Sequence, residues 1–271
     1  MVLQRNQPIR LWGTADRDTE VKVKLNGMTK SVSTDIAGNW EVVLPAMTAG
    51  GPYTISIAND GEKQVLTDVL IGDIWVCSGQ SNMEFRLQYA ATAGEDIPAA
   101  NHPEIRLFNM QPIDYTDNKA WSRKTLQRMN SLDYFKEAEW KQSTPESVED
   151  FSAIAYHFGR ALHLGTGVPI GLIHNAVGGS PTEAWIDRLT LEHHPRLVGM
   201  FANWSTNDYI NGWCRERAAK NSEYSENALQ RHPYHPAYLY EAGIVGITRL
   251  PIAGVIWYQG ESNEQNVELH E

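Results

Sequence analysis

Apolar and polar residues alternate with a period of two through much of the first seventy residues, as they do in half-buried β-strands. In the run 19–25, three apolar residues fall on one face and two lysines on the other. Asn26-Gly27 follows, a dipeptide that suits a tight hairpin because it accepts positive φ angles. Similar runs occupy residues 40–44, 53–57 and 65–70. Short strands separated by turns predict a small antiparallel β-sandwich.

A different pattern begins near residue 73. Residues 74–77, 169–174 and 252–258 form short apolar runs of the kind found in central strands that are covered on both faces. Between the first two runs, apolar residues at 151, 154, 155, 158 and 162 share one face of an amphipathic helix. Buried strands separated by helices predict an α/β fold with a parallel sheet.

The change of pattern predicts two domains. We expect an Ig-like β-sandwich over residues 1–68 and an α/β domain over residues 69–271. The stretches 111–150 and 192–240 are rich in Trp, Tyr, His, Asn and charge, and they show weak periodicity. Long irregular segments in a compact domain usually serve function, so we interpret both as insertions near the mouth of a site.

Composition excludes several classes of protein. With 42% hydrophobic and 21% charged residues, the 271-residue chain is an ordinary globular protein. A formal net charge of −10 argues against nucleic acid or an anionic membrane as partner, because both bind basic surfaces. No run approaches 18 uninterrupted apolar residues, so no transmembrane helix is expected. Cys77 and Cys214 form no CxxC unit, and we expect two buried thiols.

Three polar turns that contain glycine follow the three apolar strand runs. They occupy residues 77–83, 175–180 and 258–263. In an open α/β sheet, ligands bind beyond the carboxyl ends of the strands. We therefore expect the three turns to converge on one crevice, and their coincidence indicates a site more strongly than any one turn does.

The turns contain the groups that acyl transfer requires, a nucleophile and donors aimed at developing negative charge. Ser81 is the candidate nucleophile. Gly178 and Gly179 let a backbone N–H approach a substrate closely. Gln259 or Asn263 offers a side-chain amide as a further donor.

Each candidate also has a purely structural explanation. Ser81 suits a helix N-cap and the glycine pair suits a C-cap. Glu261 could orient the amide of Gln259 or Asn263, or a substrate hydroxyl, and its structural explanation is a hydrogen bond within the fold. No G-x-S-x-G, P-loop, dinucleotide-binding or H-E-x-x-H motif occurs. The histidines at 193–194 and at 232 and 235 are flanked by prolines, so we expect turns there and no metal site.

Three blocks of sequence carry a family resemblance when they are taken in order. They read Cys77-Ser78-Gly79-Gln80-Ser81-Asn82-Met83, Gly178-Gly179-Ser180-Pro181-Thr182-Glu183-Ala184-Trp185 and Trp257-Tyr258-Gln259-Gly260-Glu261-Ser262-Asn263. In this order and spacing they resemble the sialate O-acetylesterase family, which belongs to the SGNH hydrolase superfamily and is related to acetylxylan esterases. The resemblance extends over most of the chain, including the N-terminal β-region, and implies an SGNH-hydrolase-like, flavodoxin-like parallel sheet.

The resemblance implies a role for residues in each block. Ser81 is then the acyl-accepting nucleophile, and the oxyanion hole takes its own N–H, the N–H of Gly179 and the side chain of Gln259. Gly178 is the alternative to Gly179, and Asn263 is the alternative to Gln259 because the wider superfamily has an Asn in the third block. The candidates for binding substrate or supporting the site are Gln80, Asn82, Gly178, Glu261 and Asn263.

The implied reaction removes an acetyl ester from a sugar hydroxyl, typically on sialic acid, and needs no cofactor. The expected partner is an O-acetylated sugar, and the location implied by the resemblance is periplasmic or secreted. Two alternatives stay open, an acetylxylan esterase and a catalytically incompetent glycan-binding protein. Abundant Trp and Tyr in the insertions suit stacking on sugar rings in either case.

The base of the family is a histidine in a D-x-x-H block, and this chain departs from that pattern. No Asp in the 271 residues is followed three places later by His. We therefore expect a fragment of a longer esterase, truncated in its catalytic domain and nearly inactive alone, since a serine hydroxyl is a weak nucleophile without a base. If the chain proves active, His174 is the first candidate for the base.

Overall fold

The computed structural model describes residues 1–265, whose strands form a nine-stranded mixed sheet and a separate two-stranded antiparallel sheet. The strands are β1 (Val2–Gln4), β2 (Ile9–Thr14), β3 (Glu20–Leu25), β4 (Met28–Ser33), β5 (Asn39–Leu44), β6 (Gly50–Ala58), β7 (Lys63–Gly79), β8 (His102–Asn109), β9 (Trp140–Ser143), β10 (Ile170–Ala176) and β11 (Gly254–Tyr258). The α-helices are α1 (Ser81–Glu84), α2 (Ala93–Asp96), α3 (Arg123–Asn130), α4 (Pro145–Glu149), α5 (Ala153–Thr166), α6 (Arg188–His193) and α7 (Gly212–Asn221). Shorter helical turns are η1 (Leu87–Tyr89), η2 (Thr182–Trp185), η3 (Val198–Phe201), η4 (Trp204–Thr206), η5 (Tyr240–Ile244), η6 (Val245–Ile247) and η7 (Glu261–Asn263).

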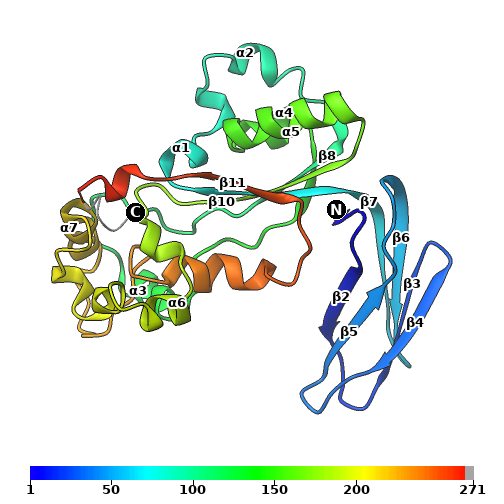
Figure 1. Cartoon of the computed structure of the whole chain (residues 1–271), viewed down its shortest axis with the longest axis horizontal. Helices are drawn as coiled ribbons and strands as arrows, with labels where there is room; N and C mark the ends of the chain where they lie inside the picture. Colours follow the sequence, from blue (N-terminus) through cyan, green and yellow to red (C-terminus); the bar gives the residue numbers. More distant parts are fainter. Residues whose placement is uncertain (266–271) are drawn as a thin grey trace.

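The N-terminal strands form the predicted β-sandwich (Figure 1). One layer consists of β4, β3, β6 and the first half of β7, and the other consists of β2 and β5. Apolar side chains from both layers, among them Val23, Trp40 and Ile55, meet in one buried cluster. Asn26 and Gly27 turn the β3–β4 hairpin with φ angles of 45° and 77°, as their dipeptide predicts.

The 17-residue strand β7 runs through both parts of the molecule. Its first half pairs antiparallel with β6, and its second half pairs parallel with β10 and β11. The register between β6 and β7 shifts next to Asp68, which takes a φ of 56°. The domain boundary expected between residues 68 and 69 stays a prediction. It falls at this irregularity, inside one continuous strand.

Helices cover both faces of the second part of the sheet, which confirms the predicted α/β class. Figure 1 shows α4 and α5 on one side of the sheet and α3 and α6 on the other. Successive residues of β10 face opposite clusters, Leu172 towards α5 and Ile173 towards the other side, and the whole strand is buried. The predicted helix begins after Ser152, whose hydroxyl accepts the Ala155 N–H, and ends at Gly167, which has a φ of 66°.

The third apolar run does not form a buried strand, so that prediction is wrong. Only residues 254–258 of the run pair with the sheet, as β11, and β11 has β7 as its one neighbour among the described residues. The side chains of Val255, Trp257 and Tyr258 are 53%, 45% and 45% exposed. An apolar run at a sheet edge has the same sequence pattern as a central strand, which is why the pattern did not separate the two.

The irregular stretches fold into short elements on both sides of the sheet (Figure 1). Residues 111–150 contain α3, β9 and α4, and residues 192–240 contain η3, η4 and α7. Parts of both stretches contribute to the pocket described below. None of the helices within residues 1–265 combines the length and apolar character that crossing a bilayer requires.

Candidate active site

The carboxyl ends of β10, β7 and β11 lie side by side, so the three glycine turns meet as predicted. Gly79, at the end of β7, stands opposite Ala176 of β10 and Tyr258 of β11. Gly79 has a φ of 140°, and a Cβ there would lie 2.1 Å from the Tyr258 carbonyl oxygen. The close approach of the two strands therefore requires glycine at this position.

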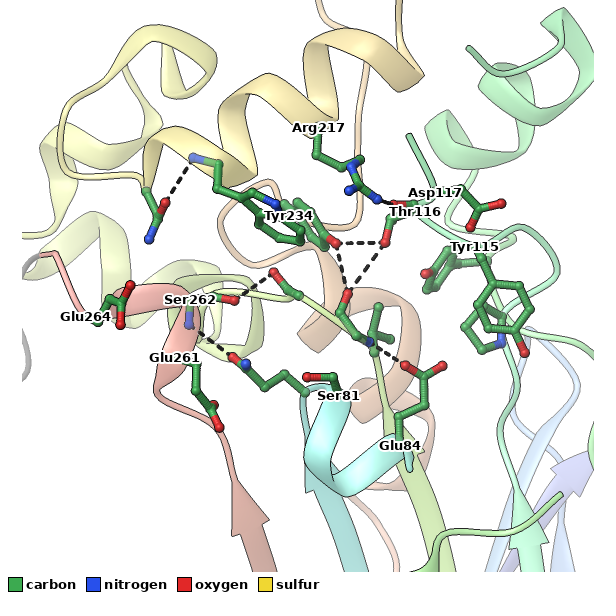
Figure 2. Close-up of a pocket in the computed structure, with 18 of the residues that line it drawn as sticks. Ser81, Glu84, Tyr115, Thr116, Asp117, Arg217, Tyr234, Glu261, Ser262 and Glu264 are labelled. Atoms are coloured by element: carbon green, nitrogen blue, oxygen red, sulfur yellow. Dashed lines mark hydrogen bonds between the residues drawn. The ribbon is translucent and has the colours of Figure 1, made fainter. Parts of the chain in front are cut away.

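A pocket of about 520 Å³ opens where the turns meet (Figure 2). It is lined by Gln80, Ser81, Glu84, Pro112, Tyr115, Thr116, Asp117, Tyr134, Val177, Gly178, Gly179, Asn211, Trp213, Arg217, Tyr234, Glu261, Ser262, Glu264 and Gln265. One side of the pocket thus comes from the turns at the sheet edge and the other from the two irregular stretches. The aromatic and polar character of the lining suits a sugar.

Ser81 is the first residue of α1, and its side chain is exposed at the pocket. The N-cap of α1 is Gln80, which makes no side-chain capping bond, so the N-cap explanation for Ser81 is wrong. Among residues 1–265, the Ser81 hydroxyl has no hydrogen-bond partner. The hydroxyl is therefore available to a ligand in the pocket.

The two glycines of the second turn have different surroundings. The Gly178 N–H donates to Oε2 of Glu84 at 2.7 Å, and the Gly178 carbonyl accepts the Tyr234 hydroxyl at 2.8 Å. The Gly179 N–H has no acceptor within residues 1–265. Gly179 has a φ of 72°, and a Cβ there would lie 2.3 Å from the Trp213 ring. The pocket therefore leaves the Gly179 N–H, and not that of Gly178, free to bind a ligand.

Gln259 and Asn263 are absent from the described lining of the pocket and bond to groups behind it. Nε2 of Gln259 donates to Oδ1 of Asn263 at 2.6 Å, to Oε1 of Gln80 at 3.2 Å and to the Ser180 carbonyl at 3.3 Å. Nδ2 of Asn263 donates to the buried carboxyl of Glu183 at 2.8 Å. Gln259 therefore ties the third turn to both of the others, and Asn263 ties it to η2.

Gln80 lies in the lining itself, between these groups and Ser81. Its Oε1 accepts the Ser262 N–H at 3.3 Å in addition to the bond from Gln259. Asn82 and Glu261 form a more exposed pair, in which Nδ2 of Asn82 donates to Oε1 of Glu261 at 2.5 Å. Glu261 therefore bonds the amide of Asn82, and not that of Gln259 or Asn263, the amides that it was predicted to orient.

The sequence reasoning missed several residues of the pocket. Glu84 lies one helical turn after Ser81, a spacing that could have revealed it, and burial raises the pKa of its carboxyl. Thr116, Arg217 and Tyr234 come from the irregular stretches. A guanidinium N–H of Arg217 bonds the Thr116 carbonyl, and the guanidinium lies 5.0 Å from the ring centroid of Trp213. No periodic pattern marks these three residues.

No histidine lines the pocket within the described residues. His174, the expected substitute base, is buried in β10, and its Nδ1 lies 2.7 Å from Oδ1 of Asn109. Burial lowers the pKa of His174 to about 4. The structure does not support His174 as the base at Ser81. His174 lies within β10, before the turn, and its side chain is buried in the core.

His232 and the two cysteines are buried. The His232 ring stacks on Trp121 with centroids 5.0 Å apart, and its Nε2 lies 3.0 Å from Oδ1 of Asn221. Residues 1–265 contain no group of three or more His, Cys, Asp or Glu side chains arranged to hold a metal ion. Cys77 and Cys214 are free and buried, as predicted.

Comparison with known proteins agrees with this geometry. Residues 71–271 match the family model described as carbohydrate esterase, sialic acid-specific acetylesterase. The whole chain is 28% identical to human sialate O-acetylesterase over 289 residues and covers 49% of that protein. It is also 28% identical to the mouse sialate O-acetylesterase over 298 residues, covering 52% of it. The chain therefore spans about half the length of these relatives.

A solved structure shares the fold. The crystal structure of a carbohydrate acetylesterase from Xanthomonas citri superposes with a TM-score of 0.71 at 32% identity, over 97% of this chain and 49% of that one. The family match extends over most of this chain and includes all three turns that form the pocket. The chain belongs to the carbohydrate esterase family of sialic acid-specific acetylesterases.

Proposed function

We propose that the protein is a carbohydrate O-acetylesterase of the SGNH type in which Ser81 is the nucleophile. The observation that carries this proposal is the pairing, in one pocket, of an unbonded serine hydroxyl with a backbone N–H that has no acceptor among residues 1–265, that of Gly179. Acyl transfer requires this combination of a nucleophile and a donor fixed before the substrate arrives.

The reaction proceeds in two steps. In the first, Oγ of Ser81 attacks the acetyl carbonyl carbon, its proton passes to a base, and the N–H groups of Ser81 and Gly179 stabilise the oxyanion. The tetrahedral intermediate collapses, the sugar oxygen leaves and takes a proton, and Ser81 is acetylated. In the second, water attacks the acetyl group, acetate departs, and the proton returns to Ser81. In the family that the sequence resembles, the proton acceptor is the histidine of a D-x-x-H block, and no such block occurs in the 271 residues.

We also propose that Gln80 supplies the side-chain amide of the oxyanion hole. Its Oε1 is occupied by two donors, the Ser262 N–H and Nε2 of Gln259, so Nε2 is the end of the amide left for a ligand. Gln259, predicted to be the direct donor, then orients Gln80. Asn263 acts one step further back, through its bond from Gln259.

Sialic acid is the substrate that the pocket favours. Tyr115 and Trp213 offer exposed aromatic rings to a sugar, and Arg217 is the only Lys or Arg in the described lining. A guanidinium suits the carboxylate that sialic acid carries and that the sugars of acetylxylan lack. Glu84 lies in the same lining, and burial raises the pKa of its carboxyl. The periplasmic or secreted location stays a prediction from the family.

The test is acetate release by the protein as its gene encodes it, with O-acetylated sialic acid, acetylated xylan and an aryl acetate as substrates. We expect release from the sialic acid ester and the aryl ester. Ser81→Ala should lower turnover on the order of 10⁶-fold, as the loss of a triad serine does elsewhere. The fold should not change, because the Ser81 side chain is exposed. Binding of unmodified sugar without any turnover would instead favour the glycan-binding alternative.

A further inference from the structure

A pair of hydroxyl groups holds the carbonyl of Gly178 from the far side of the pocket (Figure 2). The Tyr234 hydroxyl donates to the Gly178 oxygen at 2.8 Å. Oγ1 of Thr116 lies 2.7 Å from the Tyr234 hydroxyl oxygen and 3.5 Å from the same carbonyl. Both residues come from the irregular stretches, at positions where the sequence shows no motif.

The geometry of the peptide bond transmits this contact to the next residue. The Gly178 carbonyl and the Gly179 N–H belong to one planar trans peptide group, in which the C=O and N–H bonds point in opposite directions. An N–H opposite a carbonyl held by Tyr234 must therefore point away from Tyr234. In Figure 2, Tyr234 and Thr116 lie on one side of the pocket and Ser81 on the other.

The preceding peptide group is held as well. The Gly178 N–H donates to Oε2 of Glu84, on the helix that begins with Ser81. Gly178 is thus bonded to Glu84 through its N–H and to Tyr234 through its carbonyl. These two bonds leave the Gly178–Gly179 peptide little freedom to rotate.

We propose that Tyr234, supported by Thr116, is a positioning residue that directs the Gly179 N–H towards the acetyl oxygen of a substrate bound at Ser81. This inference rests on the proposed function. It assigns to the irregular stretches a part in forming the oxyanion hole in addition to binding sugar. Tyr234 acts through the peptide group and not by contact with the reacting atoms.

The surroundings of Tyr234 keep its hydroxyl in place and protonated. Its ring stacks on Trp213 at a centroid distance of 5.9 Å, and its backbone N–H donates to Nδ1 of His232 at 3.0 Å. Burial raises its pKa, so the hydroxyl remains a donor throughout the neutral range. A Cβ on residue 179 would lie 2.5 Å from the hydroxyl oxygen, so the contact also depends on glycine.

The first test is Tyr234→Phe, assayed for kcat and KM with an aryl acetate in the protein as its gene encodes it. The variant keeps the ring and removes the donor. We expect kcat to fall at least about 10-fold, since a misdirected catalytic group costs up to about 100-fold, while KM changes less than about twofold. Thr116→Val should lower kcat by a smaller factor. Thr116→Ser keeps the hydroxyl, so its kcat should equal that of the unsubstituted protein.

Tyr238→Phe is the matched control. Tyr238 is also fully buried, and its hydroxyl also donates to a backbone carbonyl, that of Met129, at 3.1 Å. It is not part of the described pocket lining. If Tyr238→Phe lowers kcat as much as Tyr234→Phe does, the effect is one of stability and the proposed role is wrong.

A second measurement does not depend on turnover. Methylboronic acid forms a B–O bond to a serine oxygen, which loses its proton, and a boron hydroxyl then occupies the oxyanion position. We expect Tyr234→Phe to weaken its binding by the same factor as kcat, measured by quenching of pocket tryptophan fluorescence. Unchanged kcat and unchanged boronate affinity in Tyr234→Phe would overturn the inference. Turnover or boronate binding that survives Ser81→Ala would instead overturn the proposed function, so the two failures are distinguishable.

Discussion

The β-sandwich and the far wall of the pocket are held together by different forces. In the sandwich, Val23 and Ile55 are buried in an apolar cluster that draws on both layers. Tyr234, in the wall, is equally buried, but hydrogen bonds from its hydroxyl and its backbone N–H fix its position. Thr116 joins the same network.

The difference matters because the two forces respond differently to small displacements. Apolar burial is non-directional, so a core can shift slightly and keep most of its stabilising free energy. A hydrogen bond weakens steeply when its angle changes. Substitutions in the sandwich should therefore lower the free energy of unfolding, whereas substitutions in the pocket wall should lower the rate of the reaction.

Gly179→Ala, in the pocket, should have the largest effect of the substitutions that test this comparison, and the effect should be on kcat. A Cβ at residue 179 collides with Trp213, and φ is 72°, so the peptide must move. Loss of one oxyanion donor costs about 100- to 1,000-fold in kcat, and we expect a fall of that size with an aryl acetate.

Gly165→Ala is the matched control for this substitution. Gly165 lies in α5, and a Cβ there would have no atom within 4 Å. We expect unchanged kcat and a free energy of unfolding that is higher by about 0.5–1 kcal/mol. Equal losses of kcat in the two variants would contradict a special role for Gly179.

Leu25→Ala tests the other side of the comparison. Leu25 is 1% exposed in the sandwich cluster. Removing a buried leucine side chain costs about 2–5 kcal/mol, so chemical denaturation should show a loss of unfolding free energy in that range. At a temperature where the variant is folded, kcat and KM should equal those of the parent. A fall in kcat without a fall in stability would show that the sandwich acts on the pocket directly.

Removing the ion pair between Asp68 of β7 and Arg106 of β8 should have the smallest effect, and the effect should be on stability. Oδ2 of Asp68 lies 2.5 Å from a guanidinium nitrogen of the buried Arg106, and the hydrogen bonds from Arg106 lower the pKa of Asp68 to about 2. Because the folded-state pKa lies below the unfolded value, the pair stabilises the fold fully above about pH 4. This contribution disappears as the pH falls towards 2.

Asp68→Asn tests this prediction through the free energy of unfolding as a function of pH. The Asp68 side chain is 43% exposed, so solvent screening should hold the loss at neutral pH below about 1 kcal/mol. The difference from the parent should be constant between pH 7 and 5 and shrink between pH 4 and 2. A difference that grows on acidification would contradict the assigned pair.

The sequence predicted those parts of the molecule in which a local pattern decides the structure. Alternation predicted β3, the apolar face at 151–162 predicted α5, and the glycine turns predicted the place where Ser81 and Gly179 meet. In each case neighbouring residues carry the signal, because burial on one face repeats with the period of the element.

The other parts depend on long-range placement. Val255 and Trp257 have the pattern of a buried strand, and only their position at the sheet edge exposes them. Thr116 and Tyr234 meet across 118 positions of sequence, and no periodicity connects them. Whether Gln80 or Gln259 faces the pocket likewise depends on which donors surround each amide, which local sequence does not specify.

The most direct test of the account is to locate the acetyl group on the enzyme. The protein is mixed with an aryl acetate, quenched in acid within milliseconds, digested, and analysed by mass spectrometry. We predict acetylation of Ser81, and none at Ser180 or Ser262, which lie in the other two turns. Acetate release with the acetyl group on another residue, or with no acetylated serine at all, would contradict the claim that Ser81 is the nucleophile.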